Sequence, residues 1–208
     1  MSTINHHSQT PNLPRIFLIR HGETQWSLTG QHTGQTDISL TPHGETEARQ
    51  LACLLTNISF SQVLCSPLKR ARQTCMAAGL GENPLTVPEL VEWDYGDYEG
   101  QRSADIHQQL PDWNVYQDGC PRGESPEQIS ARADKLIARL RQSEGNIALF
   151  THGQIGSAIA ARWIGLAIIN AQHLSLSTAS LSILSFDPHH PSVPIIALWN
   201  ATALSITP

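Results

Sequence analysis

The sequence predicts an α/β domain built as a three-layer sandwich, with a mostly parallel central sheet between two layers of helices. Short apolar runs alternate along the chain with stretches whose apolar residues recur at helical spacing. The runs 16–19 and 147–150 contain no polar residue, which is typical of parallel strands buried on both faces. With 208 residues, of which 40% are hydrophobic, the chain is long enough for a sizeable core. We therefore expect a single domain over 15–208, preceded by a flexible arm over 1–14.

The expected strands and helices alternate in the order that a parallel sheet with helical crossovers requires. Strands are expected at 15–20, 63–65, 86–87, 147–151, 180–186 and 194–200. Helices are expected from Pro42, at 67–78, at 102–110, from Ser125 to about 143, and at 154–164. Thr41 and Ser66 each precede a proline, which favours an N-cap followed by the first helical residue. The stretch 22–40 is a polar loop, and so long a loop in a compact domain is usually functional.

Composition and charge exclude several classes of function. The net charge is −5 and no basic run is present, so nucleic acid is not expected as a partner. No stretch approaches 18 continuous apolar residues, and 1–14 lacks the features of a signal peptide, so we expect no membrane span. The four cysteines are Cys53, Cys65, Cys75 and Cys120, with no Cys-x-x-Cys pair. They are expected to be buried free thiols in a cytoplasmic protein.

Two of the predicted strands end on a histidine followed by a glycine. Arg20, His21 and Gly22 follow the first strand, and His152 and Gly153 follow a later one. In open α/β sheets, ligands bind at the carboxyl edge of the strands. If the two strands are neighbours, both imidazoles therefore face one crevice, beside the guanidinium of Arg20.

A third strand end places an arginine at the start of a helix. Arg70 lies in the first turn of the helix that follows Ser66, where the helix dipole disfavours a cation. A bound phosphate would explain a cation there, because a guanidinium can hold two of its oxygens. Lys69 and Arg72 are expected on the solvated face of the helix. The pattern therefore indicates a site for an anion.

The stretch 92–100 places acidic residues among aromatic ones. Apolar surroundings raise the pKa of a carboxyl group, as a general acid near neutral pH requires. The pattern alone does not choose between Glu92, Asp94, Asp97 and Glu99.

From Arg15 to the last strands, the chain resembles the histidine phosphatases, also called the phosphoglycerate mutase-like superfamily. The matching motifs, in the family's order, are Arg20-His21-Gly22-Glu23-Thr24, Leu40-Thr41-x-x-Gly44, Ser66-x-Leu68-x-Arg70-Ala71-x-x-Thr74, Glu92 ahead of Tyr95-Gly96, and His152-Gly153. The resemblance implies a phosphoglycerate mutase-like fold, with His21 as the nucleophile that becomes phosphorylated and Glu92 as the proton donor. It also implies that Arg20, Arg70 and His152 form the rest of the phosphate pocket.

Further residues match positions that contact the substrate in this family. Thr33 and Gly34 align with a substrate-contact loop of the mutases, and Ser27 stands where the family often has asparagine. Tyr95 and Gly153 belong to matching motifs, so we expect substrate contacts from them as well. No cofactor and no metal are expected, because the two arginines and the second histidine can supply the positive charge that phosphoryl transfer needs.

A narrower resemblance is to the fungal sedoheptulose-1,7-bisphosphatases. It lies in the stretches 30–37, 70–74, 92–100 and 113–120. This resemblance implies a sugar bisphosphate as substrate. Arg102 and Arg122 are then candidates for holding a second phosphate, and the alternative for both is a solvated loop arginine.

The length of the segment over the site favours hydrolysis over transfer. Only 60 positions separate Glu92 from His152, whereas the glycolytic mutases carry a longer insertion that covers the site. A short lid leaves a phosphohistidine open to water. We therefore expect a phosphomonoesterase that acts on a small anionic phosphorylated metabolite, a sugar phosphate or bisphosphate. The alternatives are a cofactor-dependent phosphoglycerate mutase and a non-catalytic protein that binds a phosphate ligand. The sequence leaves open whether the chain forms a homo-oligomer.

Overall fold

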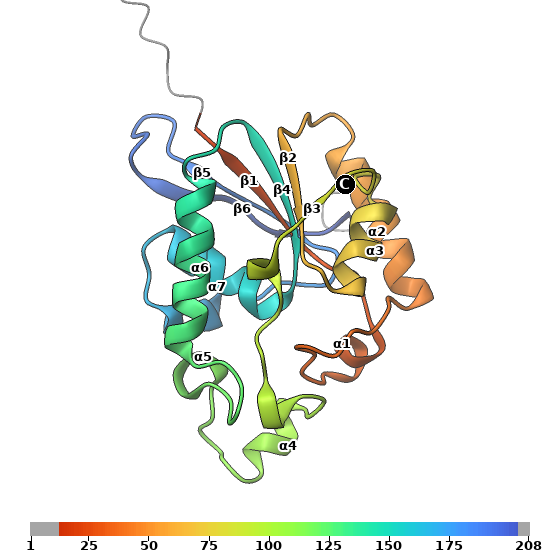
Figure 1. The fold of residues 1–208 in the computed structure, drawn as a ribbon, viewed down its shortest axis with the longest axis vertical. Coiled ribbons are helices and arrows are strands. Elements are labelled where there is room, and N and C mark those ends of the chain that lie inside the picture. Colours follow the sequence, from red (N-terminus) through yellow and green to blue (C-terminus); the bar gives the residue numbers. More distant parts are fainter. Residues whose placement is uncertain (1–12, 204–208) are drawn as a thin grey trace, which may run out of the picture.

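A six-stranded sheet forms the middle layer of the protein (Figure 1). The computed structural model describes residues 13–203. The strand order is β3-β2-β4-β1-β5-β6; the first four strands in this order are parallel, and β5 and β6 each run antiparallel to the preceding neighbour. The mostly parallel α/β sandwich predicted from the sequence is therefore confirmed. The arm expected over 1–14 falls, apart from its last two residues, outside the described part of the chain.

The strands and helices follow the predicted alternation. The strands are β1 (Arg15–Arg20), β2 (Gln62–Cys65), β3 (Leu85–Thr86), β4 (Asn146–Thr151), β5 (Leu181–Phe186) and β6 (Pro194–Ala201). The α-helices are α1 (Gln25–Thr29), α2 (Pro42–Leu55), α3 (Lys69–Ala77), α4 (Ser103–His107), α5 (Val115–Asp118), α6 (Pro126–Leu140) and α7 (Gly153–Trp163). Three 3₁₀ helices are η1 (Pro88–Leu90), η2 (Gly96–Tyr98) and η3 (Ile168–His173).

Helices cover both faces of the sheet. Helices α2 and α3 lie on one face, and α6 and α7 lie on the other (Figure 1). Successive side chains of β1 point to opposite faces, so Phe17 and Ile19 join the core on one side and Ile16 and Leu18 the core on the other. None of the four is more than 2% exposed. The uninterrupted apolar run therefore marks a strand buried on both faces.

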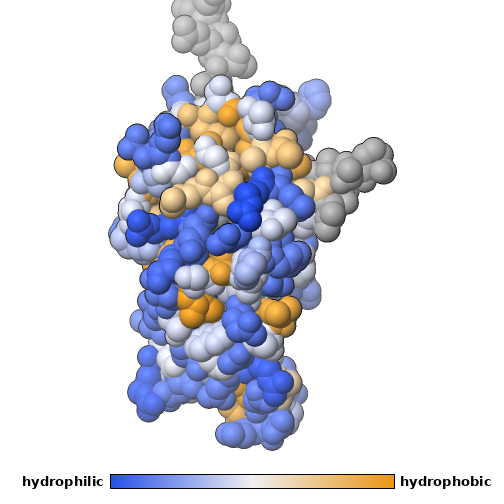
Figure 2. All heavy atoms as spheres, turned by 90° about the vertical axis from the view of Figure 1, so that its right-hand side faces the viewer, coloured by the Kyte–Doolittle hydropathy of each residue, from blue (hydrophilic) through white to orange (hydrophobic). Residues whose placement is uncertain are grey.

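The parallel strands all direct their carboxyl ends toward the lower edge of the sheet in Figure 1. The short helices α1, α4 and α5 gather below this edge, and α7 begins at it. Figure 2 shows the face that bears α2 and α3, and its lower half is mostly hydrophilic. The polar loops of the sequence are therefore collected at one end of the molecule.

The helix expected from Pro67 begins two residues later. Its N-cap position is Leu68, which provides no side-chain cap. The hydroxyl oxygen of Ser66, expected to cap the helix, accepts a 3.3 Å hydrogen bond from the backbone N–H of Leu68 and also lies 2.8 Å from a ring nitrogen of His152. A tertiary contact is therefore added to the local one that the sequence suggested.

Five short elements were not expected from the sequence: α1, α5, η1, η2 and η3. The helix predicted at 102–110 is reduced to the five residues of α4. Elements this short contain too few residues to show a helical period. Side-chain caps start two of them: Thr24 caps α1 and Asn114 caps α5.

The cysteines differ from expectation at one position. Cys65, Cys75 and Cys120 are buried free thiols, but Cys53 is exposed, because it lies on the outer side of α2. No helix within residues 13–203 is long and apolar enough to cross a membrane.

Candidate active site

Neighbouring parallel strands bring the two strand-end histidines together. Arg20 at the end of β1 is in register with Thr151 at the end of β4, so His21 and His152 leave the sheet side by side. Their ring centroids lie 5.2 Å apart. Strand β2, on the other side of β4, delivers Ser66 to the same edge. The structure thus contains the shared crevice that the strand ends predict.

His21 is held in a single tautomer. Its Nδ1 lies 2.7 Å from the carbonyl oxygen of Gly22. Because a carbonyl oxygen only accepts, Nδ1 carries the proton and Nε2 keeps its lone pair. Burial, together with the charges of Arg70 and Arg20, lowers the pKa of His21 well below its usual value. His21 is therefore a neutral imidazole in the wall of a cavity of about 340 Å³.

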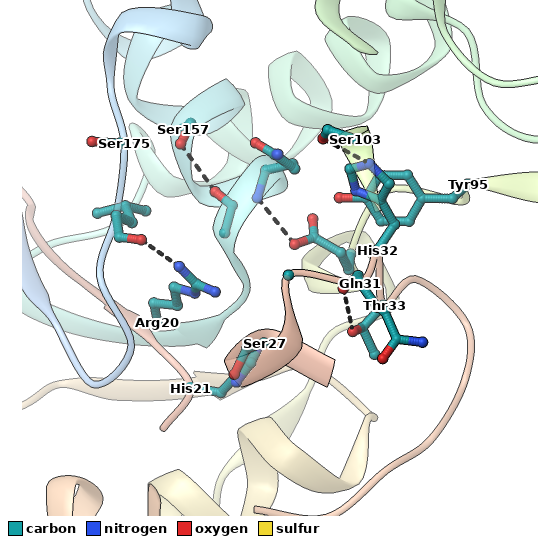
Figure 3. A pocket seen from close by; sticks show the side chains of 15 residues that line it. Arg20, His21, Ser27, Gln31, His32, Thr33, Tyr95, Ser103, Ser157 and Ser175 are labelled. Atoms are coloured by element: carbon teal, nitrogen blue, oxygen red, sulfur yellow. Dashed lines mark hydrogen bonds between the residues drawn. The ribbon is translucent and has the colours of Figure 1, made fainter. Parts of the chain in front are cut away.

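Arg20 lines the same cavity and has a donor that no protein group satisfies. Its Nη1 donates a hydrogen bond to the carbonyl oxygen of Leu176. Its Nε is buried and has no hydrogen-bond partner among residues 13–203. Figure 3 shows the guanidinium beside the cavity, above His21. A buried donor on a cation is costly unless a partner completes it, so this position favours an anion.

Arg70 lies behind the cavity wall and does not line it. The side chain is fully buried, and every nitrogen of its guanidinium donates to the protein. The acceptors are Nδ1 of His152, at 3.1 Å, and the carbonyl oxygens of Thr33, Gly34 and Thr36. Arg70 therefore anchors the 33–36 loop and places a positive charge behind His21.

His152 also lies in this buried layer. Because Nδ1 accepts from Arg70, the proton of the neutral ring is on Nε2, 2.8 Å from the Ser66 hydroxyl. Burial, followed by the charge of Arg70, lowers the pKa of His152 well below its usual value. Both Arg70 and His152 therefore bond to other protein groups in this structure, and the phosphate contacts expected of them stay a prediction.

Glu92 is the acidic residue of the 92–100 stretch that lines the cavity. Its Oε1 accepts from the backbone N–H groups of Trp93 and Ile155, and its Oε2 accepts from that of Gln154. Glu92 as a residue is 5% exposed, and its carboxyl group is fixed at the start of α7. Oε2 accepts only one of these bonds, so it retains a position that can carry a proton.

The other three acids of this stretch have structural partners outside the cavity. Asp94 accepts from the backbone of Gly96, Asp97 pairs with Arg122, and Glu99 accepts from the backbone of Gly34 and Thr36. The sequence pattern did not choose between these four acids as the general acid. Of the four, Glu92 is the one whose position lines the cavity.

The expected substrate contacts divide into two groups. Ser27, Thr33, Tyr95 and Gly153 line the cavity. Gly34 does not, because its N–H and C=O are taken up by Glu99 and Arg70 in a buried layer.

Neither of the arginines considered for a second phosphate lines the cavity. Arg102 is exposed and forms two 2.8 Å hydrogen bonds with the carboxylate of Asp105. Arg122 is exposed and is paired with Asp97. Each guanidinium is therefore paired with an acid outside the site.

Several residues of the cavity wall escaped the sequence analysis. His32 stacks on Tyr95 with ring centroids 4.5 Å apart, and its Nε2 lies 3.2 Å from the Ser103 hydroxyl. Burial lowers the pKa of His32 to about 4. In the sequence, only its position next to Thr33 in the polar loop indicated that His32 could line the site. The carbonyl of Leu176 left no signal, because any residue type provides one.

Within residues 13–203, no three His, Cys, Asp or Glu side chains are grouped as a metal site requires.

Comparison with known proteins places the chain among phosphatases. The acid phosphatase of Mycobacterium tuberculosis is 39% identical over 177 residues, which are 83% of this chain and 87% of that protein. The sedoheptulose 1,7-bisphosphatase of Saccharomyces cerevisiae is 36% identical, covering 74% of this chain and 69% of that protein. The solved structure of an open reading frame product from Mycobacterium tuberculosis superposes with a TM-score of 0.85 at 37% identity, covering 91% and 98% of the two chains.

These relatives confirm the phosphatase predicted from the motifs and the phosphoglycerate mutase-like fold. Residues 16–201, which are nearly all of the described chain, match the sequence pattern of one family, the histidine phosphatase superfamily (branch 1). The protein is a member of the histidine phosphatase superfamily, branch 1.

Proposed function

We propose that the protein hydrolyses phosphoric monoesters of small metabolites through a phosphohistidine formed on His21. One observation carries this proposal. In a single cavity, a neutral His21 with a free Nε2 lies beside Arg20, whose buried Nε has no protein partner. The pair offers a nucleophile and a site for the anion that it attacks.

In the first step, Nε2 of His21 attacks phosphorus in line with the departing oxygen. The P–N bond forms as the P–O bond breaks, and the ring becomes positively charged. The hydrogen bond from Nδ1 to the Gly22 carbonyl stabilises this charge. Glu92 gives its proton to the departing alkoxide, which leaves as an alcohol. Arg20 and the buried charge of Arg70 stabilise the non-bridging oxygens.

In the second step, water attacks the phosphohistidine. Glu92, now ionised, takes one proton from the water as the new P–O bond forms and the P–N bond breaks. Inorganic phosphate leaves, and His21 and Glu92 return to their starting protonation states. His152 and Arg70 hold the pocket in place throughout, through the bonds that connect them to each other and to Ser66.

The alternative within the superfamily is a phosphoglycerate mutase. Such an enzyme has to keep its phosphohistidine away from water while the bound substrate reorients. Between Glu92 and the start of α6, the helices of the segment over the site are only η2 with three residues, α4 with five and α5 with four. This short cover supports hydrolysis.

A panel of phosphate esters tests the proposal. Purified protein is assayed for release of inorganic phosphate from sugar monophosphates, sugar bisphosphates and an aryl phosphate. In parallel, 3-phosphoglycerate with a 2,3-bisphosphoglycerate primer is followed for isomerisation. We expect phosphate release and little isomerisation. Isomerisation faster than hydrolysis would establish the mutase, and a folded protein that binds phosphate esters without turnover would establish a binding protein.

A further inference from the structure

A second cavity, of about 300 Å³, adjoins the one that contains His21. The two share five lining residues: His32, Ser103, Gln154, Ser157 and Ser175. In Figure 3, His32 and Ser103 lie on one side of this shared wall and Ser157 and Ser175 on the other. The site is therefore one continuous space, with a reactive end at His21 and a distal compartment. The distal compartment is completed by His107, Trp113, Asn114, Val115, Tyr116, Ala171 and Gln172.

The distal compartment contains no lysine, arginine, aspartate or glutamate among its described lining residues. Its polar groups are hydroxyls, side-chain amides and two imidazoles. Of these imidazoles, His32 has its pKa lowered to about 4 and is therefore uncharged near neutral pH. The compartment thus offers hydrogen bonds without a strong electrostatic preference for an anion.

Several of these polar groups are oriented by contacts between distant parts of the chain. The Tyr116 hydroxyl donates to Oε1 of Gln154, so the amide group is fixed, while its Nε2 has no hydrogen-bond partner in the described structure. The backbone N–H of the same Gln154 donates to Glu92. Asn114 Nδ2 donates to Oε1 of Gln172 at 2.6 Å. The compartment is therefore connected to the carboxyl group that we propose as proton donor.

Aromatic side chains supply the apolar part of the wall. The indole nitrogen of Trp113 donates to the carbonyl of Gly119, so its polar atom is satisfied within the protein. The ring packs edge-on against His32 and Tyr98, at 5.5 and 5.2 Å between centroids. Rings held in this way offer apolar surface to a sugar or a heterocycle, with hydrogen-bonding groups at its edges.

We propose that the distal compartment binds the alcohol part of the substrate and selects a neutral, hydroxyl-bearing ring over a second phosphate group. The inference rests on the proposed function, because it assigns the leaving group of that same reaction. A second phosphate would require a cation, and both Arg102 and Arg122 are paired with acids outside the cavity. Nucleosides and disaccharides both contain such a neutral ring with hydroxyl groups, so monophosphates of either class are candidate substrates.

The test compares catalytic efficiency across defined esters. Adenosine 5′-monophosphate and trehalose 6-phosphate represent the two sources of a neutral ring, and fructose 1,6-bisphosphate represents a second phosphate. Glycerol 3-phosphate reaches only the reactive end. We expect kcat/KM for at least one ring monophosphate to exceed that for the bisphosphate by about tenfold or more. This is the loss expected when one charged group of a ligand is bound without a partner of opposite charge.

A charge placed in the compartment should reverse this preference in part. Gln172→Arg adds a cation at an exposed lining position. It should raise the efficiency for fructose 1,6-bisphosphate relative to the ring monophosphates by about fivefold, as expected for one partly exposed ion pair. The matched control is Gln117→Arg, which adds the same charge on exposed α5 outside both cavities and should leave the ratio unchanged.

The outcomes separate this inference from the proposed function. A wild-type preference for the bisphosphate, or equal shifts in Gln172→Arg and Gln117→Arg, would overturn the inference while leaving hydrolysis intact. Calorimetric binding to a His21→Ala variant provides the second readout. If no ester is hydrolysed but this variant binds the ring monophosphates more tightly than the bisphosphate, the inference stands and the proposed function is wrong.

Discussion

The reactive end and the distal compartment of the site are built in different ways. At the reactive end, the nucleophile and the buried groups behind it lie at the ends of neighbouring strands: His21 after β1, His152 after β4 and Ser66 after β2. Its position is fixed by the sheet register, and its buried side chains carry the charge. The distal compartment is formed by short helices and loops, from α4, α5 and η3, and its walls are nearly uncharged.

This difference separates chemistry from selection. A rigid sheet edge can hold a nucleophile and its charge partners to within the tolerance that phosphoryl transfer needs. The short elements around the distal compartment lie outside the sheet, although Ile106, Val115 and Tyr116 join the core. Exposed positions on these elements can change without disturbing that edge. We expect substitutions at the reactive end to affect every substrate and substitutions in the distal compartment to affect only some.

The largest effect is expected for Glu92→Gln at the reactive end. The variant keeps the shape of the side chain but has no proton for the departing alkoxide, so phosphoenzyme formation from a sugar phosphate should slow by ~10²–10⁴-fold. The effect on p-nitrophenyl phosphate should be much smaller, because the phenolate leaves unaided. Rapid-quench measurement of phosphoenzyme formation with both esters checks this.

Asp97→Asn is the matched control for this experiment, since Asp97 belongs to the same stretch but pairs with exposed Arg122. It should leave both rates unchanged. Equal slowing of both esters by Glu92→Gln would mean that Glu92 only supports the loop and that another group donates the proton.

A smaller effect on catalysis is expected for Gly153→Ala. This variant tests whether the phosphate group of the substrate occupies the space beside Arg20. An added Cβ would lie 3.5 Å from Nε of Arg20 and 3.6 Å from Oε2 of Glu92, which is ordinary contact without a clash. The variant should therefore fold with unchanged or slightly higher stability, since alanine is the better helix former. Its kcat/KM should fall by roughly 10- to 100-fold for every ester, because the phosphate is displaced. Full activity with unchanged stability would show that the phosphate lies elsewhere.

The smallest expected effect concerns stability at the boundary of the two regions. The pKa of His32 is about 4 in the folded protein, below the usual 6.5 expected in the unfolded chain. Between these values the unfolded chain binds the extra proton, so the free energy of unfolding should fall as pH drops from about 6.5 toward 4. His32 should account for roughly 1–2 kcal/mol of this loss by pH 5.

Urea unfolding of wild type and His32→Gln at pH 7 and pH 5 checks this contribution. The glutamine variant should be less stable at pH 7, where it loses the stacking on Tyr95, yet it should lose less stability on acidification. Parallel pH dependences for the two proteins would contradict the assignment.

The sequence predicted the reactive end because its signals are local. A buried apolar run followed by Arg20 and His21, or by His152, shows both the strand and the residue at its end. Parallel pairing of those strands then determines that the side chains meet. The fold class and the family followed from the same motifs.

The sequence did not predict the contacts between distant segments. Ser66, expected only to cap the helix, also bonds to His152, 86 residues away. Arg70 was expected to bind phosphate, and its bonds to His152 and to the 33–36 loop had no signal in the sequence. The distal compartment depends on pairs such as Asn114 with Gln172, 58 residues apart, in helices too short to leave a periodic pattern.

The most direct test of the central claim is to locate the phosphoryl group during turnover. Wild-type protein is mixed with a ³²P-labelled sugar phosphate, quenched within milliseconds under alkaline conditions that preserve phosphohistidine, digested and mapped by mass spectrometry. His21→Ala is treated in parallel, with His189→Ala as a control at an exposed histidine. We predict acid-labile phosphate on His21 in wild type and in His189→Ala, and none on His21→Ala. Label on any other residue, or label that persists in His21→Ala, would contradict the account.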